Sequence, residues 1–464
     1  MVKVKERSKF LKVFIVNIIF FIINLSFNHV FAKVVHIRVD EARDFGVKLA
    51  VIPYELSKKT TELSKITEII SNDLNYSGQF KVLSLNLNDS EIINKLPINN
   101  NNFKKLDFKF WKDTGVEYLL ITKMYPANEA QQLVINLQLI DLYKPLDPIC
   151  LNAEVIKYPN EKLNIIAHRA SDIIFQQLIG TKSFFKTKVA YIRAERLAQI
   201  DPEYSLNIAD FDGSNEHKLI TANYPLMSPS WSPDGKKIAF VSFKGNRSSI
   251  NIVDLELRKS TLISRYPGIN GAPAWSPNGE QLAMVLSKDG NPSIYLLNLV
   301  TGNLNKLTKG IGIDTEPCWS KDGQEIFFTS NRCGKPQIYK ISLVTEKITR
   351  ITFKGEYNAT PSITPDNKYL VMLHCYENCS KTKSEFSIAL QSLDNGRVKI
   401  LTKTGMEDSP TLSPNGFMII YSTKANKDSD RVLAKVSIEG NFYKYLPIIG
   451  NGSLKSPAWS PYLE

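Results

Sequence analysis

The sequence has little of what enzymes and metal sites require. Its 464 residues include five histidines, which occur singly, without a His-x-x-x-His or Cys-x-x-Cys pattern that would hold a metal. A Gly-x-Ser-x-Gly nucleophile turn is absent, and nearly all glycines fall at expected turns rather than in a phosphate-binding loop. The sequence therefore predicts a protein that is not an enzyme and that has neither a cofactor nor a metal.

One short segment resembles a metal-binding loop. Asp210-Phe211-Asp212-Gly213 matches the start of a calcium loop, but no glutamate closes the twelve-residue frame. The same segment stands where a hairpin turn between two strands belongs. A turn is therefore the favoured interpretation.

Runs of basic residues interleaved with aromatics are missing as well, so the sequence predicts no nucleic-acid partner. The formal net charge is +12; residues 1–32 hold five basic residues against Glu6, so they carry +4 and the remainder +8. A basic, solvated surface is the favoured interpretation of that remainder.

The apolar run near the N-terminus, Val13–Leu25, is thirteen residues long and therefore short for a membrane span. It follows a basic segment and precedes the small residues Val30 and Ala32. This layout predicts a signal peptide over residues 1–32, cleaved between Ala32 and Lys33, with an uncleaved anchor as the alternative. We expect a soluble exported protein that meets membranes only through its partners.

Cysteine is scarce, with five residues, although an exported protein would enter an oxidising compartment. Cys375 and Cys379 lie in the segment HCYENCSKTKSEF, where they could staple a loop, and the sequence leaves open whether they pair. Cys318 stands beside Trp319 on an expected inner strand, which favours packing. The odd count leaves at least one free thiol.

A repeated phrase dominates the C-terminal part of the chain. Pro-x-Trp-Ser-Pro-Asp-Gly, or a weaker copy of it, recurs with its marker position at Trp231, Trp275, Trp319, Ile363, Leu412 and Trp459. The steps between markers are 44, 44, 44, 49 and 47 residues. This period, without helical patterning, predicts a β-propeller with one four-stranded blade per repeat.

Each repeat predicts four strands, A to D. Strand A carries Pro-x-Trp and ends in Ser-Pro-Asp-Gly, whose residues favour a tight turn. Strand B is an apolar run such as Glu325–Thr329, and strand C alternates, as in Gln337–Ser342. Strand D is shorter and more polar, as an outer strand should be; its expected copies include Leu262–Arg265, Lys306–Thr308 and Arg350–Thr352.

The first blade lacks a strand at its own position in the chain. Lys188–Ile192, Ser205–Ala209 and His217–Thr221 supply strands B, C and D before the first repeat. The final Pro457-Ala458-Trp459 is expected to supply strand A, which closes the ring and leaves no open edge. The prediction is six blades over about residues 188–461, in a domain of residues 186–464.

Residues 47–182 predict a small α/β domain with a mixed sheet. Its expected strands are Lys48–Pro53, Phe80–Leu83, Tyr118–Thr122 and Leu133–Ile140. A first helix carries apolar residues at helical spacing: Leu63, Ile66, Ile69, Ile70 and Leu74. A second helix is expected from about Glu161, capped by Asn160, to Leu178, with Gly180 as its stop. Residues 87–102 are expected to form a loop.

A propeller without a catalytic set is usually a docking surface, and the mouth of its central channel is the natural site. There the inner strands begin, at Met227-Ser228, Gly271-Ala272, Thr315-Glu316, Ala359-Thr360, Asp408-Ser409 and Lys455-Ser456. Small and polar residues dominate, which predicts a shallow collar with room for a partner's loop. Crowding around the axis explains the small sizes equally well, but explains Glu316, Asp408 and Lys455 less readily.

The sequence resembles the TolB family, soluble periplasmic components of the Tol–Pal envelope system. The segments that carry the resemblance are ISNDLNYSGQF, IGTKSFFKTKVAYI, PLMSPSWSPDGKKIAFVSF, NGAPAWSPNGEQLA and KSPAWSPYL. The resemblance covers nearly the whole chain after residues 1–32. It implies a monomeric periplasmic adaptor that supports outer-membrane integrity and envelope constriction during cell division.

The resemblance also implies two protein partners. The lipoprotein Pal would dock at the channel mouth, on Ser228, Ile269, Ala272, Thr315, Glu316, Thr360, Ser409 and Ser456. Ile269 stands where family members can carry a polar or histidine residue, and the Cys375–Cys379 insertion also departs from the family pattern.

The second implied partner is the inner-membrane protein TolA. It would engage the mature N-terminal segment, residues 33–46, whose alternating part is Lys33, Val34, Val35, His36, Ile37, Arg38, Val39 and Asp40. Such a segment can add to an exposed sheet edge of a partner.

A secreted propeller hydrolase is the alternative function. A peptidase-like or lactonase-like enzyme of this kind would use channel carboxylates such as Glu316 and Asp408. A hydrolysis assay beside a pull-down from envelope extract separates the two hypotheses.

Overall fold

The structure is a computed structural model, and it describes residues 46–54, 61–83, 106–126, 132–158, 161–195, 202–379, 385–426 and 428–463. The predicted signal peptide at residues 1–32, the partner segment Lys33–Asp40, the loop at residues 87–102 and the cap Asn160 lie outside these ranges. Within them, no helix combines the length and the apolarity that crossing a membrane would need.

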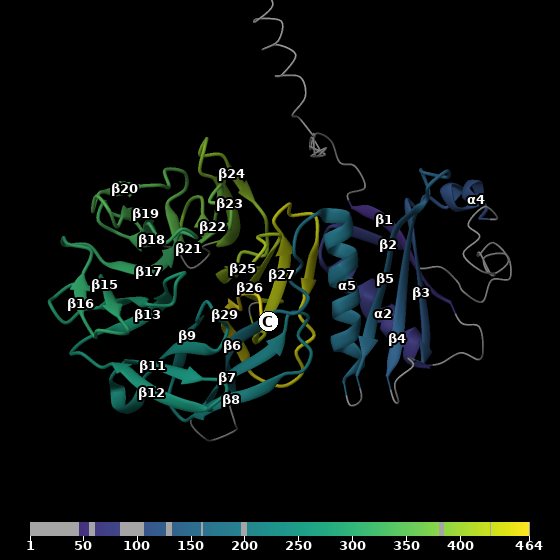
Figure 1. Cartoon of the computed structure of the whole chain (residues 1–464). Coiled ribbons are helices and arrows are strands. Elements are labelled where there is room, and N and C mark those ends of the chain that lie inside the picture. Colours follow the sequence, from purple (N-terminus) through teal and green to yellow (C-terminus); the bar gives the residue numbers. More distant parts are fainter. Residues whose placement is uncertain are drawn as a thin grey trace, which may run out of the picture. The chain divides into compact units, whose positions relative to one another are not determined.

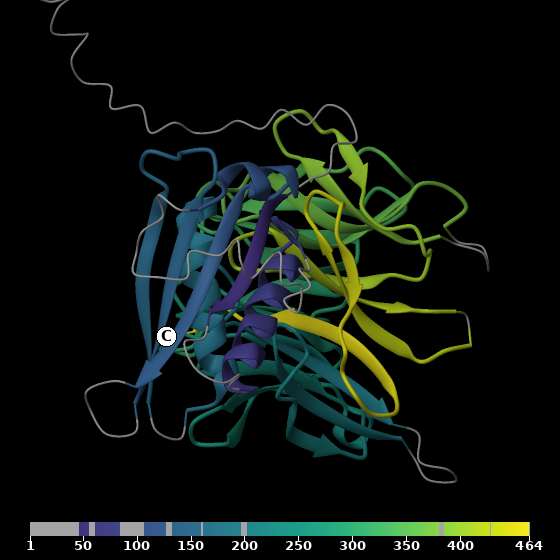
Figure 2. The same cartoon turned by 90° about the vertical axis from the view of Figure 1, so that its right-hand side faces the viewer.

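The N-terminal part of the described chain is an α/β domain built on a five-stranded sheet. Its strands are β1 (Val47–Tyr54), β2 (Phe80–Leu83), β3 (Tyr118–Pro126), β4 (Leu133–Asp141) and β5 (Ile149–Lys157), in the order β2-β1-β3-β4-β5. β1 runs parallel to β2 and β3, whereas β3 with β4 and β4 with β5 are antiparallel. Figure 2 shows β1 in purple beside the blue strands of this mixed sheet.

Helices cover both faces of that sheet. α2 (Thr61–Tyr76) and α5 (Leu163–Ile179) share a buried core with one face, which includes Ile66 and Ile166. Because side chains alternate along a strand, Ala50 and Ile52 point to the opposite face. There the short α4 (Phe108–Asp113) buries Trp111 against them.

The sequence prediction of this domain differs from the structure in three places. α5 begins at Leu163 rather than Glu161, and its N-cap Lys162 makes no side-chain capping hydrogen bond. It ends as predicted, at Gly180, which adopts the left-handed conformation with φ 81°. β5 and α4 were not predicted, because β5 is an edge strand with a single buried residue and α4 has only six residues.

The C-terminal part of the described chain is a six-bladed β-propeller, each blade a four-stranded antiparallel sheet (Figure 1). Blades 2 to 4 are β9 (Leu226–Trp231), β10 (Lys237–Ser242), β11 (Ser249–Asp254), β12 (Lys259–Ser264); β13 (Asn270–Trp275), β14 (Gln281–Leu286), β15 (Ser293–Asn298), β16 (Leu304–Lys306); and β17 (Asp314–Trp319), β18 (Glu325–Ser330), β19 (Gln337–Ser342), β20 (Ile348–Arg350). Blades 5 and 6 are β21 (Tyr357–Ile363), β22 (Tyr369–Cys375), β23 (Ser387–Ser392), β24 (Val398–Ile400); and β25 (Asp408–Leu412), β26 (Met418–Lys424), β27 (Arg431–Ser437), β28 (Tyr443–Tyr445).

Blade 1 confirms the predicted ring closure. It combines β29 (Ser453–Trp459) from the C-terminus with β6 (Lys188–Glu195), β7 (Glu203–Asp210) and β8 (His217–Ala222). Trp459 pairs with Val189 across the antiparallel seam, and the indole N–H donates to Thr187 Oγ1 at 2.7 Å. The indole is almost fully buried, so the last strand is part of the core.

Three of the predicted outer strands, β12, β16 and β20, begin and end earlier than predicted. β16 ends at Lys306 and β20 at Arg350, whereas the predicted copies ran to Thr308 and Thr352. Each of these buried threonines instead accepts the backbone N–H of strand C through its hydroxyl, Thr308 from Ile294 at 2.9 Å. A threonine side chain thus accepts the hydrogen bond at the point where the strand ends. The pattern of apolar residues looks the same in both cases, so the sequence cannot show whether the strand continues.

Two smaller predictions have clear outcomes. The segment Asp210-Phe211-Asp212-Gly213 is a turn, in which the Gly213 N–H donates to the Asp210 carbonyl at 2.8 Å. Cys375 and Cys379 form a disulfide in the loop that follows β22, whereas Cys150, Cys318 and Cys333 are free.

Candidate docking face at the strand starts

The six inner strands share an unusual backbone at their starts. The residue before the proline of each strand A has a positive φ: Ser228 49°, Ala272 42°, Glu316 55°, Thr360 51°, Ser409 50° and Ser456 48°. At the same point the pairing of strand A with strand B shifts register in every blade. We call these six residues the left-handed ring.

The left-handed ring is strained. A non-glycine residue in this region is uncommon because its Cβ approaches the following carbonyl, and such strain collects at binding sites. The ring comprises six of the eight residues predicted to dock Pal, while Thr315 lies beside it and Ile269 precedes it by three residues.

Glu316 links two blades at this ring. Its carboxylate accepts hydrogen bonds from Thr329 Oγ1 at 2.7 Å within blade 4 and from the Thr360 backbone N–H at 2.9 Å in blade 5. Protein surrounds most of the carboxyl, although the residue keeps partial exposure. Burial raises the pKa of Glu316, and the nearby Asp408 charge adds to the rise. The two hydrogen bonds lower the pKa but do not outweigh burial. These contacts give Glu316 a positioning role.

Buried polar side chains hold the loops that lead into strand A. Asn270 accepts from Ser264 Oγ at 2.7 Å and from the Tyr266 backbone N–H at 2.9 Å. At the equivalent position of blade 4, Arg332 Nη2 donates to both oxygens of Asp314 at 2.9 Å. The sequence prediction missed this layer, although a polar residue two positions before the left-handed residue is visible in the segments NGAPAW, DTEPCW and NATPSI.

Partly exposed apolar side chains precede the left-handed residues in blades 2, 3 and 4, Met227 within β9 and the two isoleucines just before β13 and β17. Met227 is 45% exposed, Ile269 48% and Ile313 47%. The Ile269 backbone is nevertheless fixed, because its N–H donates to Ser287 Oγ at 2.7 Å.

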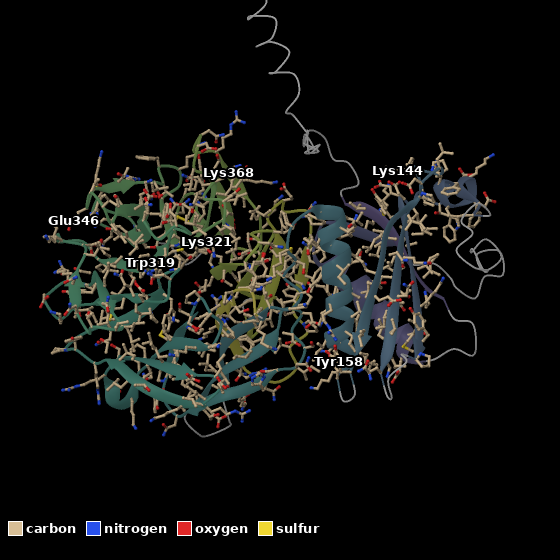
Figure 3. All side chains as sticks on the ribbon, in the orientation of Figure 1. Lys144, Tyr158, Trp319, Lys321, Glu346 and Lys368 are labelled. Carbon is tan, nitrogen blue, oxygen red and sulfur yellow. A yellow bond between two sulfur atoms is a disulfide. The ribbon has the colours of Figure 1, made fainter. Side chains whose placement is uncertain are left out.

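The tryptophans lie at the other end of strand A and serve a different purpose. The indole N–H of Trp275 donates to the Ser230 carbonyl, and that of Trp319, labelled in Figure 3, donates to the Ala274 carbonyl at 3.0 Å. Each bond joins one blade to the preceding one. Prolines and serines of all six repeats, with the tryptophans of four of them, also line a cavity of about 440 Å³, which the sequence prediction did not include.

Two known protein families match the α/β domain and the propeller separately. The TolB amino-terminal domain family matches residues 35–145, and the TolB beta propeller domain family matches residues 175–463. The Tol-Pal system protein TolB of Hydrogenovibrio crunogenus is 48% identical over 431 residues, covering 92% of this chain and 94% of the relative. This chain belongs to the TolB family.

Other TolB proteins support the assignment. The Tol-Pal system protein TolB of Pseudomonas aeruginosa is 45% identical over 433 residues, with 92% of this chain and 94% of that protein covered. The crystal structure of TolB from Acinetobacter baumannii aligns with a TM-score of 0.78 at 32% identity, covering 92% of this chain and 99% of that one.

TolB membership makes this chain a component of the Tol–Pal system in the periplasmic cell envelope. The curated relatives are named as system components, which indicates a non-catalytic protein and argues against the hydrolase alternative. Within the part of the chain that the structure describes, no group of three or more His, Cys, Asp or Glu side chains could hold a metal.

Proposed function

We propose that this chain is a periplasmic adaptor that docks Pal on the left-handed ring and engages TolA through Lys33–Asp40. Through these contacts it maintains outer-membrane integrity and supports envelope constriction in cell division. The observation that supports the docking part is the ring itself: one strained backbone conformation, repeated before the proline of strand A in every blade.

The size of the ring residues supports a loop as the docked element. Serine, alanine and threonine occupy five of the six positions, so little side-chain volume fills the mouth. Thr315 lies next to the ring and pairs with Thr329 through its backbone. We expect a large side chain at position 315 to block docking, because Thr315 directly precedes Glu316 of the ring.

Binding to purified Pal of the same organism tests the docking site. Thr315→Arg should weaken binding by at least roughly 2 kcal/mol, because central interface positions tend to be hot spots. Val344→Arg is the matched control, since Val344 is 78% exposed on the turn between strands C and D of the same blade. A folded Thr315→Arg variant that binds Pal at wild-type affinity would move the docking face elsewhere.

The TolA contact is tested separately. Deleting residues 33–40 from the mature chain should abolish TolA binding and leave Pal binding intact, because the ring lies in the propeller.

Intact-mass measurement of the exported protein should show a chain that begins at Lys33. A mature mass that retains residues 1–32 would contradict the cleaved signal peptide.

A further inference from the structure

Blade 5 has a loop that the other blades lack. Eleven residues separate β22 from β23, whereas six separate strands B and C in blades 2, 3, 4 and 6. This five-residue excess accounts for the longer step of 49 residues in the repeat. Cys375 and Cys379 close the first part of the loop with a disulfide. We call residues 375–379 the disulfide loop.

The disulfide loop lies on the same face as the left-handed ring. Cys375 pairs with Tyr357, the first residue of strand A in blade 5, and Thr360 of the ring follows on that strand. Tyr357 is close enough to the channel carboxylates that the charges of Glu316 and Asp408, after burial, raise its pKa. The loop therefore borders the docking face.

The disulfide loop is held from several sides. The Glu356 backbone N–H donates to the carbonyls of Cys375 and Tyr376, both at 3.0 Å, and the Glu356 carboxylate accepts the Cys379 N–H at 3.4 Å. The same carboxylate pairs with Lys335 Nζ of blade 4 at 2.6 Å. Together with the covalent bond, these contacts fix the loop between two blades.

A buried polar network supports the loop from below. His374 Nδ1 lies 2.7 Å from Asn358 Oδ1, and Asn358 Nδ2 donates to Gln337 Oε1 at 2.9 Å. Gln337 Oε1 also accepts from Thr352 Oγ1 at 2.7 Å. All four side chains are buried, so the residue that precedes the disulfide is anchored in the blade.

The loop presents an aromatic side chain on this fixed base. Tyr376 is 71% exposed, and the acidic Glu377 beside it is exposed as well. A tyrosine offers a large contact area with few rotatable bonds, and a rigid backbone lowers the entropy lost on binding. Burying Tyr376 in a partner would therefore be favourable.

We propose that the disulfide loop is a second contact of the docking face and inserts Tyr376 into an apolar pocket of the docked Pal protein. A basic side chain at the edge of that pocket would pair with Glu377. This inference rests on the proposed function, because it assigns the loop to the same partner as the left-handed ring.

Calorimetric titration of the mature full chain against purified Pal of the same organism tests the loop. Tyr376→Ala should weaken binding roughly tenfold, and Tyr376→Phe should restore most of it because the ring is retained. Cys375→Ser with Cys379→Ser should weaken binding about fivefold, since Tyr376 stays but loses its fixed position. Tyr143→Ala is the matched control, because Tyr143 is 62% exposed in the α/β domain.

The outcomes separate the two proposals. If the wild type binds Pal, Thr315→Arg abolishes binding and Tyr376→Ala changes nothing, the loop inference is wrong and the ring proposal stands. If the wild type does not bind Pal, both are wrong. Tyr376→Ala keeps the disulfide, so it remains decisive even if the double serine variant fails to fold.

Discussion

The left-handed ring and the contact between the α/β domain and the propeller are built in opposite ways. The ring residues are partly exposed and repeat one backbone conformation in all six blades. The domain contact instead buries charged and polar side chains. The domain contact uses each residue once, and we call it the junction cluster: Asp73, Tyr76, His168, Ser171 and Lys435.

The junction cluster gathers charge in a dry place. Asp73 Oδ2 lies 2.8 Å from His168 Nδ1 and accepts from Ser171 Oγ at 2.7 Å, and all three residues are buried. Lys435 of β27 is buried too, with its Nζ 4.6 Å from the centre of the Tyr76 ring. Among the described residues, Lys435 Nζ has no hydrogen-bond partner.

Burial shifts the pKa values of the junction residues, unless a charged partner outweighs it. Burial by itself would lower the pKa of His168, but the hydrogen bond and charge of Asp73 outweigh it and raise that pKa. Burial raises the pKa of Asp73, and it lowers the pKa of Lys435 to about 8. A substitution in the left-handed ring changes one of six equivalent positions. A substitution in the junction cluster removes a partner that no other residue replaces.

The largest expected effect lies on the propeller side. Deleting residues 456–464 removes most of strand A of blade 1 and exposes the inner edge of β6. Loss of the buried Trp459 alone should cost roughly 3–5 kcal/mol, a large share of typical domain stability. The truncated protein should aggregate or melt far lower in calorimetry. An unchanged melting temperature would show that the ring closes without β29.

The next effect compares one carboxylate from each region. Asp73→Ala should cost about 3 kcal/mol, because it leaves His168 buried without its acidic partner. Glu316→Ala should cost only about 1–2 kcal/mol, because it removes two hydrogen bonds from a partly exposed site. Urea unfolding of both variants measures the difference. Equal losses would mean that burial of the junction acid contributes little.

A pH series tests Lys435. Its folded-state pKa of about 8 lies below the ordinary lysine pKa of 10.5, so between these values the unfolded chain binds the proton and the folded chain does not. Stability should therefore rise between pH 8 and 10, by at most roughly 3 kcal/mol from this group. Asp73 and Asp212 oppose the lowered pKa, and Lys444 adds to it.

Lys435→Met is the matched variant for that series. It should lack this part of the rise with pH and be at least as stable as the wild type at pH 7, since an unpaired buried ammonium is removed. Urea unfolding at each pH gives both curves. Parallel curves for variant and wild type would show that Lys435 does not titrate in this range.

The smallest effect probes the strain of the left-handed ring. Ser228→Gly and Ser409→Gly should each stabilise the fold by about 0.5 kcal/mol, because glycine relieves the positive φ but gains freedom when unfolded. The two gains should add, since the sites lie in separate blades. Ser260→Gly, on the outer strand β12, should be destabilising instead. Thermal melts of the single and double variants provide the measurement.

The propeller was predictable because its signals are local. Ser-Pro-Asp-Gly favours a turn wherever it occurs, and an apolar run such as Glu325–Thr329 lies inside β18. Each of these local signals occurs in six repeats, which strengthened the prediction. The predicted strand ends were wrong where a side-chain hydrogen bond and a backbone hydrogen bond suit the same residue. Thr308 is an example, because its hydroxyl accepts a hydrogen bond beyond the end of the strand.

Local sequence signals were enough to predict the propeller, its closure by the C-terminal strand and the helices that cover one face of the α/β sheet, because turn residues and apolar periodicity act over a few residues. The left-handed ring and the junction cluster became visible only in the folded protein. Asp73 and His168 are 95 residues apart, and Lys435 comes from another domain. No local pattern marks such residues, because their cost and their stabilisation arise only when distant elements exclude water around them.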